Sequence, residues 1–160
     1  TTINELPTPE EMVEIAIQTA KEVVSMGYKP RVAFLSFSNF GNPMKEKAMR
    51  VREAVAILDK MEEELEYDGE MSADIALNPE ARKNYPFCKL SGPANVLIMP
   101  GLHSANIASK LLQEIGKGIV IGPVLYGLEK HVQVLQMGAS ESDILNLASI
   151  AANRLVAEGS

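Results

Sequence analysis

The sequence predicts an α/β fold in three layers, with a mostly parallel sheet between helices on both of its faces. Three short runs carry this prediction, because each is apolar along its length and bounded by turn residues, as in strands buried on both faces. Helical patterns alternate with these runs, as they do in parallel sheets. The runs cover residues 32–37, 96–99 and 119–121.

The first helix is predicted from its own start signal. Thr8 takes the N-cap position, Pro9 the first helical position, and Glu11 completes a capping box. Gly27 is a typical residue after a helix end. The apolar positions fall on one helical face: Met12, Ile15, Ala16, Ala20, Val23 and Val24.

The other elements follow from local signals in the same way. After the first run we expect a loop at 39–43 and a helix from about Met44 to Glu63. Next we expect a brief strand at 65–67, a turn at Asp68–Gly69, and a helical stretch over 70–85 interrupted at Asn78–Pro79. The last elements are a helix over 104–115, a candidate fourth strand at 132–136, and a helix from Glu141 to about Ala157 capped by Ser140.

Length and composition narrow the possible functions. The 160 residues fit one domain, and 46% hydrophobic with 22% charged residues is typical of a soluble globular protein. The net charge of −6 argues against nucleic-acid binding, and no apolar run approaches the ~20 residues of a membrane helix. A single cysteine, Cys88, forms no internal disulfide. We therefore expect a cytoplasmic protein, and the first residue, Thr1, suggests a piece of a longer chain.

The segments that follow the strands are the first place to look for a ligand, because open parallel sheets bind ligands at the carboxyl ends of their strands. Here they are residues 38–43, 100–106 and 122–127. Two interpretations stay open: ligand-binding loops or ordinary turns. The candidate ligand-binding residues in these segments are Ser38, Asn39, Gly41, Asn106, Gly122, Pro123 and Gly127.

Lys45 and Lys47 lie at the predicted start of the second long helix, where the helix dipole favours anions over cations. A bound phosphate would reverse this penalty, since it gains from both the dipole and the ammonium groups. The alternative is a pair of solvated lysines.

Several titratable residues have structural explanations that suffice. Asp68, Glu70 and Asp74 would suit a substrate or metal, but turns and first helical turns also select acids. Asp143 stands three residues after Ser140, as in a capping box. His103 has no evident partner, and we expect Cys88 to be packed rather than reactive. No residues here predict a metal site.

Ordered motifs along almost the whole chain resemble the phosphate acetyltransferase family. They are 30–38 (PRVAFLSFS), 51–54 (VREA), 68–71 (DGEM) with Asp74, 94–100 (ANVLIMP), 121–128 (IGPVLYGL), and 138–140 (GAS) with Asp143 and Ile144. The resemblance implies the fold of these transferases and of the isocitrate and isopropylmalate dehydrogenases, with acyl-CoA between two subdomains. Residues 1–160 would be the second subdomain plus the C-terminal helix.

The chain departs from this family at the residues that act on phosphate. The resemblance places a Ser-Arg pair of the active transferases at Gln136 and Met137, and a further arginine at Glu114. Only the aspartate is retained, as Asp143. Because fixed cations stabilise the charge that develops in acyl transfer to phosphate, we expect transferase activity to be lost. No residue is assigned as catalytic; Gln136 and Met137 remain ligand-binding candidates.

The runs at 36–43 (SFSNFGNP) and 85–88 (YPFC) are similar to the C-terminal domain of the hybrid NADP-dependent malic enzymes of bacteria. This resemblance implies a homo-oligomeric module that binds acetyl-CoA as an effector and inhibits malate oxidation by a malic enzyme domain of the same chain. NADP and a divalent metal (Mg or Mn) would bind that other domain, and this part would hold no cofactor. Lys110 and Lys130 are further candidates for the CoA phosphates.

Two alternatives remain from other functional classes. One is an active phosphate acetyltransferase, which makes acetyl phosphate and CoA from acetyl-CoA and phosphate; the retained Asp143 favours it. The other is an oligomerisation scaffold that binds no ligand, for which the apolar face at 12–24 would serve as an interface unless it packs in the core.

Overall fold

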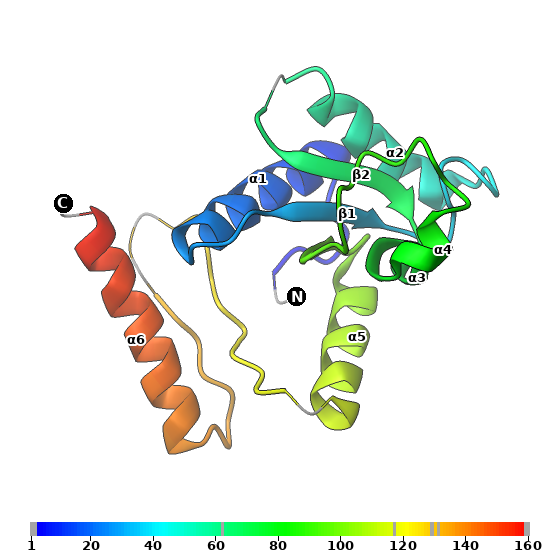
Figure 1. Ribbon diagram of the computed structural model, residues 1–160. Helices are drawn as coiled ribbons and strands as arrows, with labels where there is room; N and C mark the ends of the chain where they lie inside the picture. The colour runs from blue at the N-terminus through cyan, green and yellow to red at the C-terminus, as the bar shows by residue number, and fades with distance from the viewer. Residues whose placement is uncertain (1–2, 62, 117, 129, 131, 159–160) are drawn as a thin grey trace. The chain divides into compact units, whose positions relative to one another are not determined.

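The computed structural model describes residues 3–61, 63–116, 118–128, 130 and 132–158 (Figure 1). They form two compact units, one of residues 3–105 and one from Asn106 onward. The elements, in chain order, are α1 (Pro9–Ser25), β1 (Arg31–Leu35), α2 (Glu46–Leu58), β2 (Glu66–Met71), α3 (Ala73–Leu77), α4 (Pro79–Arg82), β3 (Val96–Ile98), α5 (Leu102–Ile115) and α6 (Glu141–Glu158).

The first unit is built on a parallel sheet with the strand order β2-β1-β3. Val32 of β1 is opposite Tyr67 of β2 and Val96 of β3. Because β1 is central, the chain leaves it toward β2 on one side, while β3 is added on the other. The strand order therefore reverses between β1 and β3, and the carboxyl ends of these two strands form a topological switch point, the usual place for a ligand in such sheets.

Side chains of β1 alternate between the two faces of this sheet, and each face has its own core. Val32 and Phe34 pack with α1 and α2, whereas Ala33 and Leu35 pack with α3 and the segment before β3. This arrangement confirms the predicted α/β fold with helices on both faces. It also shows that Met12, Ala16 and Ala20 on the predicted apolar face of α1 are core residues, although Val24 is exposed.

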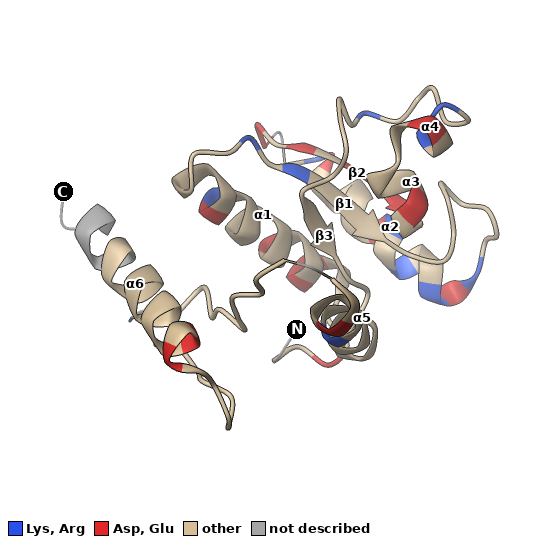
Figure 2. Ribbon diagram, turned by 60° about the horizontal axis from the view of Figure 1, so that its bottom comes forward, with Lys and Arg blue, Asp and Glu red and all other residues tan. Residues whose placement is uncertain are grey.

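The capping signals in the sequence are confirmed at two helices. In α1 the Thr8 hydroxyl accepts from the Glu11 N–H at 3.2 Å, while the Glu11 carboxylate accepts from the Thr8 N–H at 2.8 Å. In α6 Ser140 and Asp143 form the equivalent reciprocal pair. Acidic residues gather in the first turn of α6 (Figure 2), where they match the helix dipole.

The predicted turn at Asp68–Gly69 is wrong, because β2 runs through both residues as far as Met71. The Asp68 carboxylate is buried and accepts from the N–H groups of Gly69 and Lys89, at 2.9 and 2.6 Å. Lys89, which is distant in the chain, thus provides a hydrogen bond to Asp68, whereas the local pattern places Asp68 in a turn. The helical stretch after it begins later and forms two helices, α3 and α4, with Asn78 capping the second.

The predicted strands at 119–121 and 132–136 are also wrong, since these described residues form no strand. Ile119 is 87% exposed, and Val132 and Val134 are exposed as well. An apolar run becomes a strand only beside a partner strand that takes its hydrogen bonds, and the second unit offers none among its described residues. Two differences are smaller. The helix predicted from Met44 to Glu63 is α2, which begins at Glu46 and ends at Leu58. Phe37, predicted in the first strand, lies outside β1 and is exposed.

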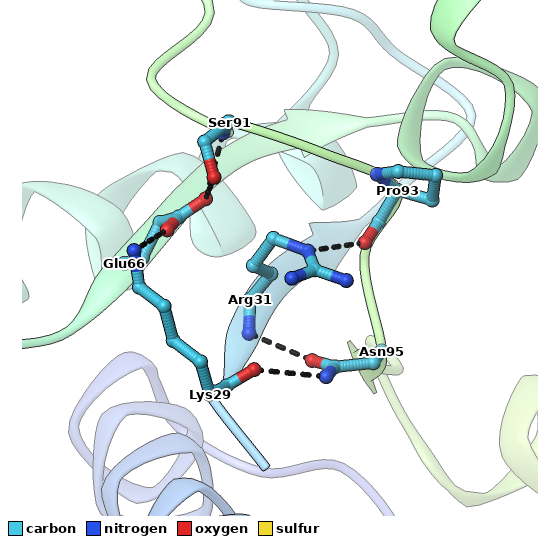
Figure 3. A network of polar contacts seen from close by, with 6 residues as sticks. All are labelled: Lys29, Arg31, Glu66, Ser91, Pro93 and Asn95. Atoms are coloured by element: carbon cyan, nitrogen blue, oxygen red, sulfur yellow. Dashed lines mark hydrogen bonds and ion pairs between the residues drawn. The ribbon is translucent and has the colours of Figure 1, made fainter.

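A network of hydrogen bonds and one ion pair connects the amino ends of β1 and β2 to Lys29 and to residues 91–95 (Figure 3). Glu66 of β2 forms an ion pair with Lys29 at 2.6 Å and accepts from the N–H and hydroxyl of Ser91, both at 2.7 Å. Arg31 of β1 donates from Nε to the Pro93 carbonyl and from its N–H to Asn95 Oδ1, each at 2.7 Å. The loop that follows β1 lies at the opposite, carboxyl edge of the sheet. Among the described residues no helix is long and apolar enough to cross a membrane.

Candidate functional site

The loop that follows β1 is held to the end of β2 by a buried carboxylate. Glu70 Oε1 accepts from the Ser38 hydroxyl at 2.8 Å and from the Gly41 N–H at 2.6 Å. The Glu70 carbonyl also accepts from the Phe40 N–H at 2.8 Å. Two of the predicted ligand-binding residues, Ser38 and Gly41, are thus brought together at the carboxyl edge of the sheet.

Asn39, a third predicted residue, ties the same loop to the start of α3. Its Oδ1 accepts from the Ser72 N–H at 2.7 Å and lies 2.9 Å from the Ser72 hydroxyl oxygen. The Ser72 hydroxyl donates its proton to Asp74, and this bond lowers the pKa of the Asp74 carboxyl. The loop therefore has a defined conformation in the unit to which it belongs.

The lysines at the start of α2 lie beyond this loop and are exposed. Lys45 is the N-cap residue, with no capping hydrogen bond from its side chain, and Lys47 is in the first turn. This position agrees with solvated lysines, and the anion site stays a prediction. Further along α2, Arg50 Nη2 donates to the Pro100 carbonyl at 2.7 Å, which links α2 to the loop after β3.

The second unit contains a cavity of about 120 Å³. It is lined by residues from four segments: Gln113 of α5, residues 120–122, residues 135–139, and Asp143 with Leu147 of α6. The segments around Gly122 and Gln136 that the sequence singles out for a ligand are therefore neighbours here.

Lys110 supplies the positive charge beside this cavity. Its ammonium group donates to Gln136 Oε1 at 2.9 Å and to Gln113 Oε1 at 3.4 Å. Neither amide carries a charge, so the ammonium keeps its full positive charge and a free direction for an anionic ligand. The side chain of Met137, next to Gln136, is fully exposed at the same cavity.

Asp143 is the one acid among the described residues that line the cavity, and its carboxylate caps the start of α6. Asp143 Oδ2 accepts from the Ser140 hydroxyl and the Ser140 N–H, both at 2.8 Å. The bond from the hydroxyl, followed by that from the N–H, holds the pKa of the Asp143 carboxyl below its usual value. The residue therefore stays ionised, and its capping role explains its presence without catalysis.

The family model for phosphate acetyl/butaryl transferases matches residues 1–152, almost the whole chain. The chain belongs to this family. The motifs quoted above, from Pro30 to the start of α6, lie within the matched range.

The relatives of this family member fall into two groups. An NADP-dependent malic enzyme of Rhizobium meliloti (strain 1021) is 54% identical over 152 residues, which are 95% of this chain and 20% of that protein. A phosphate acetyltransferase of Bacillus subtilis (strain 168) is 38% identical over 94% of this chain and 47% of its own length. The chain therefore spans about a fifth of the first protein and about half of the second.

Solved structures give the same family fold. The crystal structure of a phosphotransacetylase from Streptococcus pyogenes superposes with a TM-score of 0.91 at 38% identity, and it covers 97% of this chain and 47% of that one. EutD phosphotransacetylase from Staphylococcus aureus superposes with a TM-score of 0.87 at 37% identity, and it covers 96% of this chain.

The remaining predicted residues of this family member lie away from the cavity lining. Glu114 follows Gln113 on α5 but does not line the cavity, and Asn106 is exposed on the same helix. Pro123 and Gly127 belong to a segment that Gln133 holds through the N–H and carbonyl of Leu125, at 2.9 and 3.3 Å. Lys130, His103 and Cys88, which the sequence also singles out, belong neither to the loop after β1 nor to the cavity lining. Lys130 and His103 are exposed, whereas Cys88 is half-buried. Burial raises the pKa of the Cys88 thiol.

Sequence reasoning missed two functional candidates in this family member. The sequence predicts Glu70 at the start of a helical stretch, and no local pattern shows that it reaches the loop after β1. Gln113 has a weak signal, because it lies one helical turn after Lys110 and therefore on the same helix face. Within the described ranges, no three His, Cys, Asp or Glu side chains are grouped to hold a metal ion.

Proposed function

We propose that this chain is an acetyl-CoA-sensing regulatory and oligomerisation module of an NADP-dependent malic enzyme, with transferase activity lost. The 54% identity to a malic enzyme, against 38% to a phosphate acetyltransferase, supports this choice. Residues 1–160 would be the second subdomain and C-terminal helix of its acetyltransferase-like part. Malate oxidation, NADP and the divalent metal would belong to the malic enzyme domain.

The residues at and beside the cavity carry the proposal. Gln136 and Met137 stand where the family resemblance places a serine and an arginine, and Glu114 where it places another arginine. Phosphate transfer needs fixed cations on the reacting phosphate, and each lost donor of this kind typically costs orders of magnitude in rate. Lys110, bonded to two neutral amides, still provides one cation, which suits binding of an acyl-CoA without transfer.

Regulation requires a difference in affinity. Acetyl-CoA would inhibit malate oxidation only by binding one arrangement of the assembled enzyme more tightly than another. The outward face of α5 supports an interface with another part of the assembly. Ile107, Leu111 and Ile115 follow one another at four-residue spacing and are 54%, 55% and 77% exposed.

The test uses the full-length protein. Malate oxidation is followed at increasing acetyl-CoA, and binding of acetyl-CoA is measured by calorimetry on the same preparation. Saturable binding with inhibition, and no acetyl phosphate formed, supports the sensor. Absence of binding together with an intact oligomer in light scattering would overturn it in favour of the scaffold without a ligand.

A second candidate is a working phosphate acetyltransferase. The family assignment and the ionised Asp143 in the cavity wall favour it. A coupled assay for acetyl-CoA formation from acetyl phosphate decides between the two. Turnover at ordinary enzyme rates, ~1 s⁻¹ or more, would establish this candidate and refute the loss of activity.

A further inference from the structure

Glu70 occupies an irregular position in the sheet. Phe34 of β1 is opposite Gly69, and Leu35 is opposite Met71, so the register shifts and Glu70 has no partner residue in β1. Irregularities of this kind re-aim a side chain, often beside a functional site. Here the Glu70 side chain is directed beneath the loop that follows β1, where it is 1% exposed.

The carboxylate of Glu70 is poorly satisfied for so buried a group. Oε1 accepts both loop hydrogen bonds, from Ser38 and Gly41, whereas Oε2 is buried with no hydrogen-bond partner. None of the ion pairs among the described residues includes Glu70. An unpartnered buried oxygen destabilises a fold, and an apolar side chain would avoid that cost. Core packing therefore does not explain why an acid is found here.

The hydrogen bonds of Glu70 all act on one short segment. Through its side chain and its carbonyl it fixes Ser38, Phe40 and Gly41. These residues belong to the loop that follows β1, one of the two strands at the switch point, where sheets of this kind bind ligands. A loop fixed before binding loses less conformational entropy when a ligand arrives.

We infer that Glu70 is a positioning residue that preorganises the loop of residues 36–43 for binding of an acyl-CoA. The inference rests on the proposed function for the identity of the ligand, but not for the action of Glu70 on the loop. Glu70 acts through the Ser38 hydroxyl and the Gly41 N–H, and it does not itself contact the ligand.

Asp68 provides a matched control. It is also a buried acid of β2, 5% exposed, and it accepts two backbone N–H bonds. Its partners are Gly69 and Lys89, neither of which belongs to the loop. A substitution of Asp68 therefore shows the effect of losing a buried acid while the contacts of Glu70 with the loop are kept.

The experiment compares Glu70→Leu, Glu70→Gln and Asp68→Asn in the full-length protein. Glu70→Leu removes the acceptor, and we expect exchange of the Gly41 amide hydrogen to rise at least tenfold and the acetyl-CoA Kd to rise about tenfold. Glu70→Gln keeps an oxygen for Ser38 and Gly41, so it should recover most of both losses. Asp68→Asn should lower the unfolding midpoint and change neither loop exchange nor Kd.

Ser38→Ala gives a second route if Glu70→Leu does not fold. It removes one donor and should weaken acetyl-CoA binding severalfold without unfolding the sheet. Unchanged Gly41 exchange in a folded Glu70→Leu protein, or unchanged Kd in both Glu70→Leu and Ser38→Ala, would overturn the inference. If the unaltered protein binds no acetyl-CoA, the proposed function fails, and Gly41 exchange alone then decides whether Glu70 fixes the loop.

Discussion

Lys110 on α5 donates a hydrogen bond from its ammonium group to Gln136 Oε1 across 2.9 Å, beside the cavity of the second unit. The two residues are 26 positions apart in the chain, and Glu114, one turn along α5 from Lys110, forms no ion pair with it. The ammonium group is thus directed to a neutral amide and is not paired with Glu114. This arrangement keeps a positive charge at the cavity in a chain with a net charge of −6.

Replacement of Lys110 should weaken acetyl-CoA binding. Lys110→Met keeps an unbranched side chain, one atom shorter, and removes its charge, and we expect the Kd of the full-length protein to rise about tenfold, as for loss of one charged hydrogen bond. Lys83→Met is the control, since Lys83 is an exposed lysine in the other unit that pairs with Glu80. Calorimetry measures both, and equal Kd values for the two variants would contradict the role of Lys110.

An arginine at position 137 should increase the affinity for phosphate. The Met137 side chain is exposed at the cavity, so Met137→Arg adds a guanidinium there without burying a charge, and guanidinium binds phosphate through paired hydrogen bonds. We expect inorganic phosphate to bind at least tenfold more tightly, measured by phosphorus NMR titration. Met26→Arg, at an exposed methionine after α1, should have no effect. A gain in both variants would indicate nonspecific attraction.

Local signals in the sequence were enough for the helices and for two strands. Thr8 and Ser140 each cap a helix where the sequence predicts one, because a cap depends only on residues within one turn. The runs at β1 and β3 are apolar enough to be recognised by themselves. In contrast, Ile119–Ile121 has the same apolar pattern but forms no strand, because strand formation depends on a neighbour that a local pattern does not contain.

The residues of the candidate site also fall into those that the sequence predicts and those that it does not. The sequence predicts Ser38 and Gly41 for one loop and Gly122 for another, while Gln136 follows from the family resemblance; Ser38 lies with Gly41, and Gly122 with Gln136. Asn39, which lies between Ser38 and Gly41 in the chain, is predicted for the same reason, because it belongs to the loop that follows a strand. Glu70 was not predicted as their partner, because its link to Ser38 crosses 32 residues and depends on the register shift in the sheet.

Gly69→Ala should destabilise the first unit strongly. A Cβ atom at Gly69 would lie 2.8 Å from both the Cβ and the carbonyl oxygen of Phe34, which is fully buried, so neither atom has room to move. We expect a loss of about 2–3 kcal/mol or more in the free energy of unfolding. Gly27→Ala is the matched control: it has a positive φ of +84° with nothing within 4 Å, so it should cost only about 1 kcal/mol. Urea denaturation measures both, and equal losses would refute the role of Phe34.

The ion pair between Lys29 and Glu66 should make stability depend on pH in acid. Burial opposes ionisation of Glu66, but the bonds from Lys29 and Ser91 outweigh it and lower the pKa of the Glu66 carboxyl from 4.5 to about 2. A carboxyl whose pKa is lower in the folded state stabilises the fold above the unfolded pKa. Its contribution should therefore be complete above about pH 4.5 and lost as the pH falls toward 2.

Glu66→Gln isolates this contribution, since the amide does not titrate. We expect the variant to be less stable than the unaltered protein at pH 6, and the difference to shrink as the pH falls from 4.5 to about 2. Glu80→Gln, at an exposed acid paired with Lys83, is the control and should change the free energy of unfolding little at pH 6, because surface pairs contribute little. Thermal unfolding followed by circular dichroism across this range measures the slopes. A difference between Glu66→Gln and the unaltered protein that stays constant with pH would show that Glu66 acts through packing rather than through its charge.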